Sequence, residues 1–193
     1  MLRMAIRKTT LEAPWDAASP EIFAIVSGPE ITIAEDMARR DFTVNAMARR
    51  LADGQLVDPF GGREDLGRRE LRTVAAHSFA EDPLRILRGL RLVSQLEFSL
   101  AAETVEQMRH EAGGLDHVSA ERVGGGLAAD GLGELSKLLL GRHPAHALRL
   151  GRDTGVLAHV LPELQAAVGY DPGSERQPVT LDEHVFLVVQ AAR

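Results

Sequence analysis

The sequence predicts an α+β protein that is mainly α, with a few short strands near its start and helices over the rest. Apolar residues make up 45% of its 193 residues, which is enough to bury a core. Aromatic residues make up only 4%, which favours helices because strands are enriched in aromatic and β-branched residues. From about residue 79 onward, apolar residues also recur at helical spacing.

Two short strands and the start of a helix are expected first. The runs Met4–Thr10 and Ile22–Ser27 are typical of strands, and a loop containing proline and alanine separates them. Thr32 and Glu35 have the spacing of a capping box, in which each side chain accepts a backbone N–H of the other residue. A helix is therefore predicted to begin near Ile33.

The following segment combines helix, loop and strand. Phe42–Leu51 is expected to form a second helix, followed by a turn and a short strand at Gln55–Val57. Asp58–Gly62 is expected to be a loop before a short helix that ends near Arg69. A further strand is predicted at Leu71–Val74.

Helices separated by glycine- or proline-containing turns are expected over the remaining chain. Their apolar spacing predicts them at Phe79–Leu96, Ala101–Ala112, Ser119–Ala129, Leu132–Gly141, Pro144–Thr154 and Thr180–Ala192. The strands are too few for a sheet of ordinary size, and the last helix has no cap or following turn. These two features lead us to expect the central part of a longer protein.

Composition and charge exclude several classes of protein. The chain has no cysteine, which rules out disulfides and thiolate zinc sites and is compatible with a cytoplasmic protein. No uninterrupted apolar run is long enough to span a membrane. The net charge is −6, yet 20 of the 22 basic residues are arginines, and 11 of these lie between residues 36 and 91. This distribution favours a phosphate-binding cleft over a general nucleic-acid surface, although genomic base composition also explains the arginine bias.

The helix after Glu81 presents charged residues on one face. Asp82 is suited to cap this helix, and Pro83 is suited to its first turn. On a helical wheel, one face carries a carboxylate and two guanidinium groups around a glycine gap: Asp82, Arg85, Arg88 and Gly89. The apolar residues form a separate core face: Ile86, Leu87 and Leu90.

Asp82 and Arg85 together match the edges of cytosine and adenine. Each of these bases presents an amino donor beside a ring-nitrogen acceptor, whereas uracil and guanine present a carbonyl acceptor beside an N–H donor. An aspartate accepts and an arginine donates, so a buried mismatch with uracil or guanine costs about 1–3 kcal/mol per unpaired group. The spacing also fits a helix cap plus an i,i+3 salt bridge without a ligand, and spacing alone favours this second interpretation.

A second candidate site is the segment Arg39–Ala46. Two arginines directly before the predicted helix can bind phosphates together with the free N–H groups at the helix start. Asn45 can hydrogen-bond a ribose hydroxyl, and Asp41 can cap the helix or orient an arginine. The alternative is that Asp41 is only an N-cap and that Arg39 and Arg40 are solvated.

Five segments, in this order, resemble the motifs of one enzyme family: Arg39–Ala46, Asp58–Gly62, Leu71–Val74, Glu81–Arg88 and Ser119–Arg122. The first is similar to the RRDFTxNA motif of the class II tRNA nucleotidyltransferases that add CCA, which are grouped with the bacterial poly(A) polymerases. The resemblance spans residues 32 to about 165. It implies a partial polymerase-β-like nucleotidyltransferase head followed by an all-helical neck and body.

The resemblance also implies a division into domains. Residues 1–76 would form the partial head, and residues 77–141 a neck that recognises the nucleotide and binds RNA. Residues 142–178 would begin the helical body, and residues 179–193 a truncated histidine–aspartate-type domain. In that last domain His184 would be the first metal ligand, but a single ligand is not expected to hold a metal ion.

Individual roles follow from the resemblance. The nucleotide-binding residues that it implies are Arg40, Asp41, Asn45, Asp82, Arg85 and Arg88. The supporting residues that it implies are Arg39, Glu81, Asp58, Gly61 and Gly62. Within these sets, Asp82 and Arg85 resemble a protein template for the incoming base, and the Asp58–Gly62 loop resembles a flexible hinge. Ser119–Arg122 resembles a neck motif that is more structural than catalytic.

The partners that the resemblance implies are the tRNA 3′ end, CTP and ATP, with Mg²⁺ as the cofactor of full-length members. Family heads carry an Asp-x-Asp pair that holds two magnesium ions, and this sequence has no Asp-x-Asp. We therefore expect no catalytic residue and no metal site on this chain, and no activity from it alone. The alternatives are a non-catalytic nucleotide- or tRNA-binding module and a poly(A) polymerase-type member.

Overall fold

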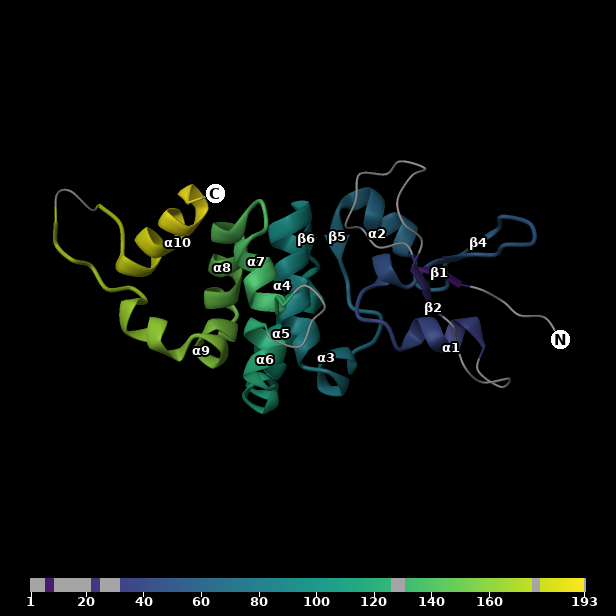
Figure 1. Cartoon of the computed structure of the whole chain (residues 1–193), viewed down its shortest axis with the longest axis horizontal. Helices are drawn as coiled ribbons and strands as arrows, with labels where there is room; N and C mark the ends of the chain where they lie inside the picture. Colours follow the sequence, from purple (N-terminus) through teal and green to yellow (C-terminus); the bar gives the residue numbers. More distant parts are fainter. Residues whose placement is uncertain (1–5, 9–21, 25–31, 126–130, 175–177, 193) are drawn as a thin grey trace. The chain divides into compact units, whose positions relative to one another are not determined.

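The computed structural model describes residues 6–8, 22–24, 32–125, 131–174 and 178–192 (Figure 1). The chain divides into two compact units, Met1–Ser78 and Phe79–Arg193. Each unit has its own buried core residues and is described by itself. Within the ranges given above, no helix is long and apolar enough to cross a membrane.

Two antiparallel strand pairs lie in the first unit. β1 (Ile6–Lys8) pairs with β2 (Ile22–Ala24), which confirms the two strands predicted at the start. β3 (Ala48–Arg49) pairs with β4 (Leu56–Val57), so that Ala48 is opposite Val57 and Arg49 is opposite Leu56. The outer parts of the first two predicted strands, residues 4–5, 9–10 and 25–27, lie outside the described residues.

α1 (Ile33–Ala38) begins where the sequence predicts it. The Thr32 backbone N–H and hydroxyl donate to the Glu35 carboxylate at 2.6 and 2.8 Å, and the Glu35 N–H donates to Thr32 Oγ1 at 3.2 Å. This reciprocal pair is the predicted capping box, and it satisfies N–H groups that the first turn leaves without helical partners. On the inner face of α1, Met37 is buried with Ala46 and Ala48 in a small core.

The prediction of a helix over Phe42–Leu51 is wrong. The segment instead contains a short 3₁₀ turn, η1 (Thr43–Asn45), and then β3. The reason is tertiary pairing, because Phe42 forms an antiparallel bridge with Thr73 and the Thr43 N–H donates to the Arg72 carbonyl at 2.9 Å. These bonds direct the backbone donors to a distant segment, so the helical pattern in the sequence does not decide the local structure.

The remaining elements of the first unit agree with the sequence. α2 (Gly62–Arg68) follows the Asp58–Gly62 loop and ends at Arg69, which has a left-handed backbone with φ +54°. β5 (Glu70–Leu71) lies at the start of the strand predicted at Leu71–Val74.

The second unit begins with a helix that proline interrupts. α3 (Ser78–Glu81) and α4 (Leu84–Leu96) replace the single helix predicted over Phe79–Leu96. Pro83 has no N–H and disfavours helical geometry at the residue before it, so the chain turns at Asp82 and Pro83. The predicted core face of α4 is confirmed, since Ile86, Leu87 and Leu90 are fully buried.

The rest of the second unit is mainly helical. Its elements are β6 (Ser99–Leu100), α5 (Ala102–Glu111), η2 (Ala112–His117), α6 (Ala120–Gly124), α7 (Glu134–Leu139), α8 (Pro144–Asp153), α9 (Val156–Val160), η3 (Pro162–Ala167) and α10 (Leu181–Ala191). The helices predicted near α5, α7, α8 and α10 are confirmed. The helix predicted over Ser119–Ala129 ends at Gly124, and residues 126–129 lie outside the described residues. β6, α9 and η3 were not predicted.

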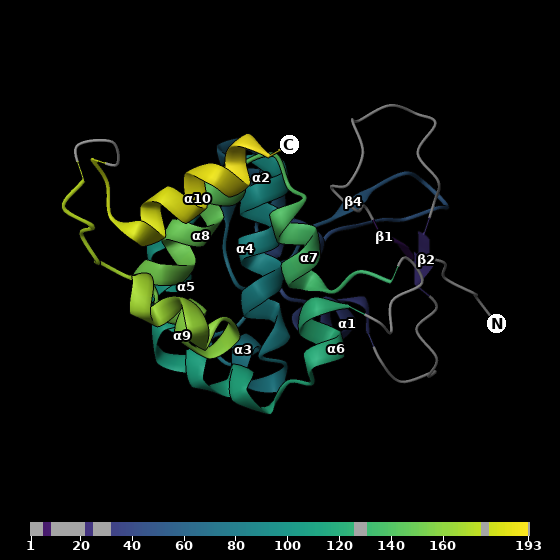
Figure 2. The same ribbon diagram turned by 60° about the vertical axis from the view of Figure 1, so that its left-hand side comes forward.

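α4 is the central helix of this unit, and α7 and α8 both pack against it (Figure 2). A buried hydrogen bond joins Ser94 Oγ to the Leu138 carbonyl at 2.7 Å, and Arg91 Nε donates to Glu134 at 2.7 Å. A Cβ on Gly141 would lie 2.0 Å from Ser94 Oγ, so only glycine fits at the end of α7. These contacts fix the helix that carries Arg85 and Arg88.

Candidate functional site

The arginines of the Arg39–Ala46 segment lie at the end of α1, because the helix predicted to follow them does not form. Arg39 is exposed, and its backbone N–H donates to the carbonyls of Asp36 and Met37. Arg40 Nη2 donates to Asp36 Oδ2 at 2.7 Å, and its side chain is 16% exposed. The expected phosphate site at a helix start is therefore wrong in its local geometry, since the two arginines lie at a helix C-terminus.

Asp41 and Asn45 lie together in the first unit. Asp41 is buried, and its Oδ1 accepts hydrogen bonds from the Phe42 N–H at 2.8 Å and from Asn45 Nδ2 at 3.1 Å. Its carbonyl accepts from the Val74 N–H at 3.2 Å. Asp41 thus orients Asn45 across the 3₁₀ turn, which is a more specific role than the N-cap weighed as the alternative.

A buried polar network holds this turn in place. Thr43 Oγ1 donates to Asp65 Oδ2 at 2.7 Å, and Arg72 Nε lies 3.4 Å from the same oxygen. Arg72 Nη2 also donates to Glu70 at 2.6 Å. Neither Thr43 nor Asp65 is among the candidate residues that the sequence indicates. Asp65 lies in the first turn of α2, where an acidic residue is common without any functional role.

The Asp58–Gly62 loop is anchored at both of its ends. The Asp58 carboxylate accepts the N–H of Gly62 at 2.7 Å and that of Arg63 at 2.9 Å, and so caps α2. Gly61 has φ +74°, a backbone conformation that favours glycine. A Cβ on Gly62 would lie 2.1 Å from the Thr43 carbonyl oxygen. The loop is therefore packed directly against the Arg39–Ala46 segment; its role as a hinge stays a prediction.

In the second unit, Asp82 lies in the turn between α3 and α4. Its Oδ1 accepts the Leu84 N–H at 3.3 Å, but the N-cap of α4 is Pro83, so the prediction that Asp82 is the N-cap is wrong by one residue. Arg122 Nη2 donates to both Asp82 oxygens, at 3.1 and 3.2 Å, and Asp82 and Arg122 are 31% and 46% exposed. The family resemblance implies only a structural neck role for Arg122, and no local pattern in the sequence indicates a contact across 40 positions.

Arg85, on the same face as Asp82, has a different partner from the one that spacing suggests. Arg85 Nη1 donates to Glu81 Oε2 at 3.2 Å, an i,i+4 pair in place of the i,i+3 pair with Asp82 that the alternative interpretation named. Arg85 is 14% exposed, and Arg88 lies one turn further along α4, partly buried. Gly89 is buried, so the expected open gap around it is wrong.

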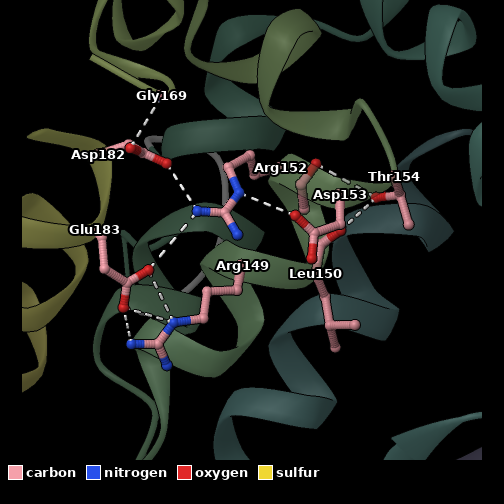
Figure 3. Close-up of polar contacts among 9 residues, drawn as sticks. Arg149, Leu150, Arg152, Asp153, Thr154, Gly169, Asp182 and Glu183 are labelled. Carbon is pink, nitrogen blue, oxygen red and sulfur yellow. Dashed lines mark hydrogen bonds and ion pairs between the residues drawn. The ribbon is translucent and has the colours of Figure 1, made fainter. Parts of the chain in front are cut away.

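The start of α10 is joined to α8 by a cluster of ion pairs (Figure 3). Arg149 binds the Glu183 carboxylate through Nε at 2.8 Å and through Nη2. Arg152 Nη1 donates to Asp182 Oδ2 at 2.7 Å, and the Gly169 N–H donates to Asp182 Oδ1 at 3.2 Å. These contacts pack α10 against α8 within the same unit.

Among the acids of this cluster, Asp182 has the pKa that is most clearly lowered. Burial by itself would raise the pKa of Asp182, but hydrogen bonds from Thr180, Arg152 and Gly169 outweigh that effect and lower the pKa to about 2. The pKa of Glu183 is also lowered, chiefly by its hydrogen bonds from Arg149. Both carboxylates are therefore ionised at neutral pH and hold the two helices together.

Metal-ligating side chains do not gather in the part of the chain that the structure describes, where no group of three or more His, Cys, Asp or Glu residues could hold a metal ion. His184 is exposed on α10. His143 Nε2 lies 2.7 Å from Glu97 beside a cavity of about 300 Å³ that His146 also lines.

Two protein families match most of the chain. Residues 5–72 match the family described as "Poly A polymerase head domain". Residues 97–168 match the family described as "Probable RNA and SrmB- binding site of polymerase A".

Curated relatives extend this similarity. The chain is 43% identical over 174 residues to the "Multifunctional CCA protein" of Azoarcus sp. (strain BH72), a match that covers 88% of this chain and 40% of that protein. It is 40% identical over 173 residues to the protein of the same description from Chromobacterium violaceum, with the same two coverages. The chain thus spans about two fifths of the length of these relatives.

Solved structures show a similar fold. A CCA-adding enzyme from Bacillus stearothermophilus in complex with CTP superposes with a TM-score of 0.59 at 40% identity, over 72% of this chain and 35% of that one. A CCA-adding enzyme from Thermotoga maritima complexed with tRNA has a TM-score of 0.57 at 33% identity, over 68% and 31% of the two chains.

Proposed function

Because the chain belongs to the family of CCA-adding tRNA nucleotidyltransferases and poly(A) polymerases, we propose that it forms the nucleotide-recognition and RNA-binding part of a cytoplasmic enzyme that adds C and A to tRNA 3′ ends. In the whole reaction, the 3′ hydroxyl of the tRNA attacks the α-phosphate of CTP or ATP, and pyrophosphate leaves. This chain contributes the choice of base and contacts to the nucleotide.

The observation that carries the proposal is the turn at Asp82. Its carboxylate is part of the surface, and Arg85 lies one helical turn further along α4. A carboxylate only accepts and a guanidinium only donates, so the two side chains match the amino group and ring nitrogen of cytosine or adenine. In the structure both are paired within the protein, Asp82 with Arg122 and Arg85 with Glu81. Binding a base therefore replaces or shares these contacts.

The Arg39–Ala46 segment is suited to the ribose and triphosphate. The Arg40 guanidinium has five N–H donors, and its bond to Asp36 uses one of them. Asn45 is held by Asp41 in a fixed orientation, which lowers the entropy lost when its amide binds a ribose hydroxyl. We assign Arg40, Asp41 and Asn45 to the sugar and phosphates, with Arg39 as support, and Arg88 to the nucleotide side of α4.

Magnesium, which the family uses, does not fit the residues at hand. Two-metal phosphoryl transfer needs closely spaced carboxylates, and the sequence contains no Asp-x-Asp. The described residues hold no suitable group of ligands either. We therefore derive no step through a metal ion.

The second candidate function is a nucleotide- or tRNA-binding module without chemistry. It is supported by the hydrogen-bond donors of Arg40, Asn45 and Arg85, which can bind a nucleotide without a metal ion.

Substitution of Asp82 tests the proposed base recognition. We expect the unaltered chain to bind CTP and ATP about tenfold more tightly than UTP and GTP, a ratio set by the matched hydrogen bonds. Asp82→Ala removes the acceptor and brings the four affinities within about twofold of one another. Isothermal titration calorimetry with each triphosphate measures these ratios. Equal affinities in the unaltered chain, or an unchanged ratio in Asp82→Ala, would contradict the template role.

A further inference from the structure

The buried pair formed by the Thr43 hydroxyl and the Asp65 carboxylate lies in the segment proposed to bind the sugar. Thr43 Oγ1 donates to Asp65 Oδ2 at 2.7 Å, and the two residues are 2% and 4% exposed. They are 22 positions apart, so the bond joins the start of η1 to the first turn of α2. Burying a carboxylate is costly unless donors surround it, and Thr43 and Arg72 both supply donors to this one.

The backbone of Thr43 is held by the same part of the first unit. Its N–H donates to the Arg72 carbonyl at 2.9 Å, and a Cβ on Gly62 would lie 2.1 Å from its carbonyl oxygen. Gly62 and Asp65 both belong to α2, and Arg72 directly follows β5. Contacts to the hydroxyl, the N–H and the carbonyl thus fix the first residue of η1 against these two elements.

Asn45 is the last residue of the same turn. Its Nδ2 donates to Asp41 Oδ1 at 3.1 Å, and the Ala46 N–H donates to the Thr43 carbonyl at 2.9 Å. An asparagine amide has two N–H donors and an oxygen acceptor. The bond to Asp41 uses one of these donors, and the second donor and the acceptor suit the two hydroxyls of one ribose. Any shift of Thr43 moves Asn45 with it, because only Val44 separates them.

We propose that Asp65, acting through Thr43, is a positioning residue that sets how well the chain distinguishes a ribose from a sugar without hydroxyls. Asp65 does not contact the nucleotide; it fixes η1 so that the Asn45 amide meets the sugar hydroxyls in hydrogen-bonding geometry. Hydrogen bonds weaken steeply outside their preferred distances and angles, so a small displacement of η1 removes most of this preference. The inference rests on the proposed function, since it deepens the assignment of Asn45 to the ribose.

Removal of the Thr43 hydroxyl tests the inference. Thr43→Val keeps the shape of the side chain and deletes its donor, whereas Thr43→Ser keeps the donor. Isothermal titration calorimetry compares CTP with 2′,3′-dideoxy-CTP, which lacks both sugar hydroxyls. We expect CTP to bind about tenfold more tightly in the unaltered chain and in Thr43→Ser, and at most about twofold more tightly in Thr43→Val. Partial unfolding lowers both affinities by the same factor, so their ratio reports the site.

Thr154→Val is the matched control. Thr154 is also buried, at 4% exposure, and its hydroxyl donates to the Leu150 carbonyl at 2.7 Å, but it lies at the end of α8 in the second unit. We expect this variant to keep the tenfold ratio of the unaltered chain.

Asp65→Asn tests the other partner of the bond, and it does so even if Thr43→Val does not fold. It replaces a charged acceptor with a neutral one of the same shape. We expect the ratio to fall to about three- to fivefold, because hydrogen bonds to an ionised group are about twice as strong as neutral ones.

Asn45→Ala separates this inference from the proposed function. We expect Asn45→Ala to abolish the ratio, and Thr43→Val/Asn45→Ala to match it, because Thr43 acts only through Asn45. The inference is overturned if Thr43→Val and Asp65→Asn keep the full ratio while Asn45→Ala loses it. Equal affinities of the two nucleotides in the unaltered chain would instead overturn the assignment of Asn45 to the ribose, and the Asp65 role with it.

Discussion

At the scale of single residues, Gly62 shows how closely the segments of the first unit are packed. It begins α2, and its backbone N–H is bound by the Asp58 carboxylate. The carbonyl of Thr43 lies where a Cβ would be placed, and this carbonyl belongs to the 3₁₀ turn that carries Asn45. Any side chain at position 62 must therefore displace backbone atoms of the proposed nucleotide-binding segment.

Alanine substitutions of Gly62 and of Gly67, both on α2, are expected to change the free energy of unfolding in opposite directions. We expect Gly62→Ala to lower the free energy of unfolding by about 1–3 kcal/mol, because its Cβ would overlap the Thr43 carbonyl. A Cβ at Gly67 meets no atom within 4 Å, so Gly67→Ala should raise stability by about 0.5–1 kcal/mol. Urea denaturation of both variants measures the difference. Equal effects of the two substitutions would show that Gly62 is not closely packed.

At the scale of secondary-structure elements, α8 and α10 depend on charge for their attachment. Arg149 and Arg152 project from α8 toward Asp182 and Glu183 in the first turn of α10 (Figure 3). Arg152 also lies 5.7 Å from the centre of the Phe186 ring, so the same side chain combines an ion pair with an aromatic contact. Asp182 is buried at 1% exposure, which makes its charge costly without this partner.

The lowered pKa of Asp182 predicts a specific loss of stability in acid. The folded-state pKa of about 2 is below the ordinary value of 3.8, so the ionised form stabilises the fold above about pH 4. This contribution of about 2 kcal/mol is lost as pH falls from about 4 to about 2. Asp182→Asn should lose correspondingly less stability over that interval. Urea denaturation at several pH values measures the free energy of unfolding of each variant. Glu163→Gln, at an exposed position, is the control. If the free energy of unfolding changes with pH in the same way in the unaltered chain and in Asp182→Asn, the prediction is contradicted.

The elements also show what the sequence can and cannot predict. Local signals are sufficient for α1, with its capping box at Thr32 and Glu35, and for the core face of α4. They are insufficient at Phe42, whose bridge to Thr73 replaces a predicted helix, because backbone pairing with a segment 31 positions away leaves no local trace. The sequence predicts Pro83 in the first turn of one long helix, whereas Pro83 is the N-cap of α4, which begins at Leu84, and it separates α4 from α3.

The residues of the candidate site show the same contrast between local signals and long-range contacts. Asp82 and Arg85 are candidates because of the resemblance to a known family, since their spacing alone favours a helix cap with a salt bridge; their role in base recognition stays a prediction. The bond of Asp82 with Arg122 does not follow from either, because it depends on how α6 packs beside the turn before α4. The bond of Arg85 with Glu81 is a local i,i+4 pair. The sequence therefore indicates candidate groups, but it does not indicate the distant contact that holds Asp82.

At the scale of the whole molecule, the chain consists of two units that correspond broadly to two matched families, the head at residues 5–72 and the RNA-binding region at residues 97–168. Residues with proposed roles are found in both units. The sequence contains no Asp-x-Asp, the closely spaced pair of acids expected to hold two metal ions. Because nucleotide-binding candidates are present and the acidic pair is absent, we predict that the chain by itself binds nucleotides without catalysing their transfer.

Incorporation of nucleotides tests that prediction. We expect no transfer of labelled C or A from CTP and ATP to a tRNA transcript that lacks CCA, when this chain is incubated with it and Mg²⁺. A complete relative such as the Azoarcus protein is the positive control for the transcript. Incorporation of C and A, but not of U or G, would show that acids outside an Asp-x-Asp motif support the reaction.

The ion pair between Asp82 and Arg122 has a further electrostatic consequence. A nucleoside triphosphate and an RNA backbone are both polyanions, and an isolated carboxylate at their binding surface repels them over roughly a Debye length of 8–10 Å. Arg122 offsets the charge of Asp82 at 3.1 Å while leaving an oxygen able to accept a hydrogen bond. In the proposed function, this pairing would present an acidic hydrogen-bond acceptor to a base without opposing the approach of the phosphates attached to that base.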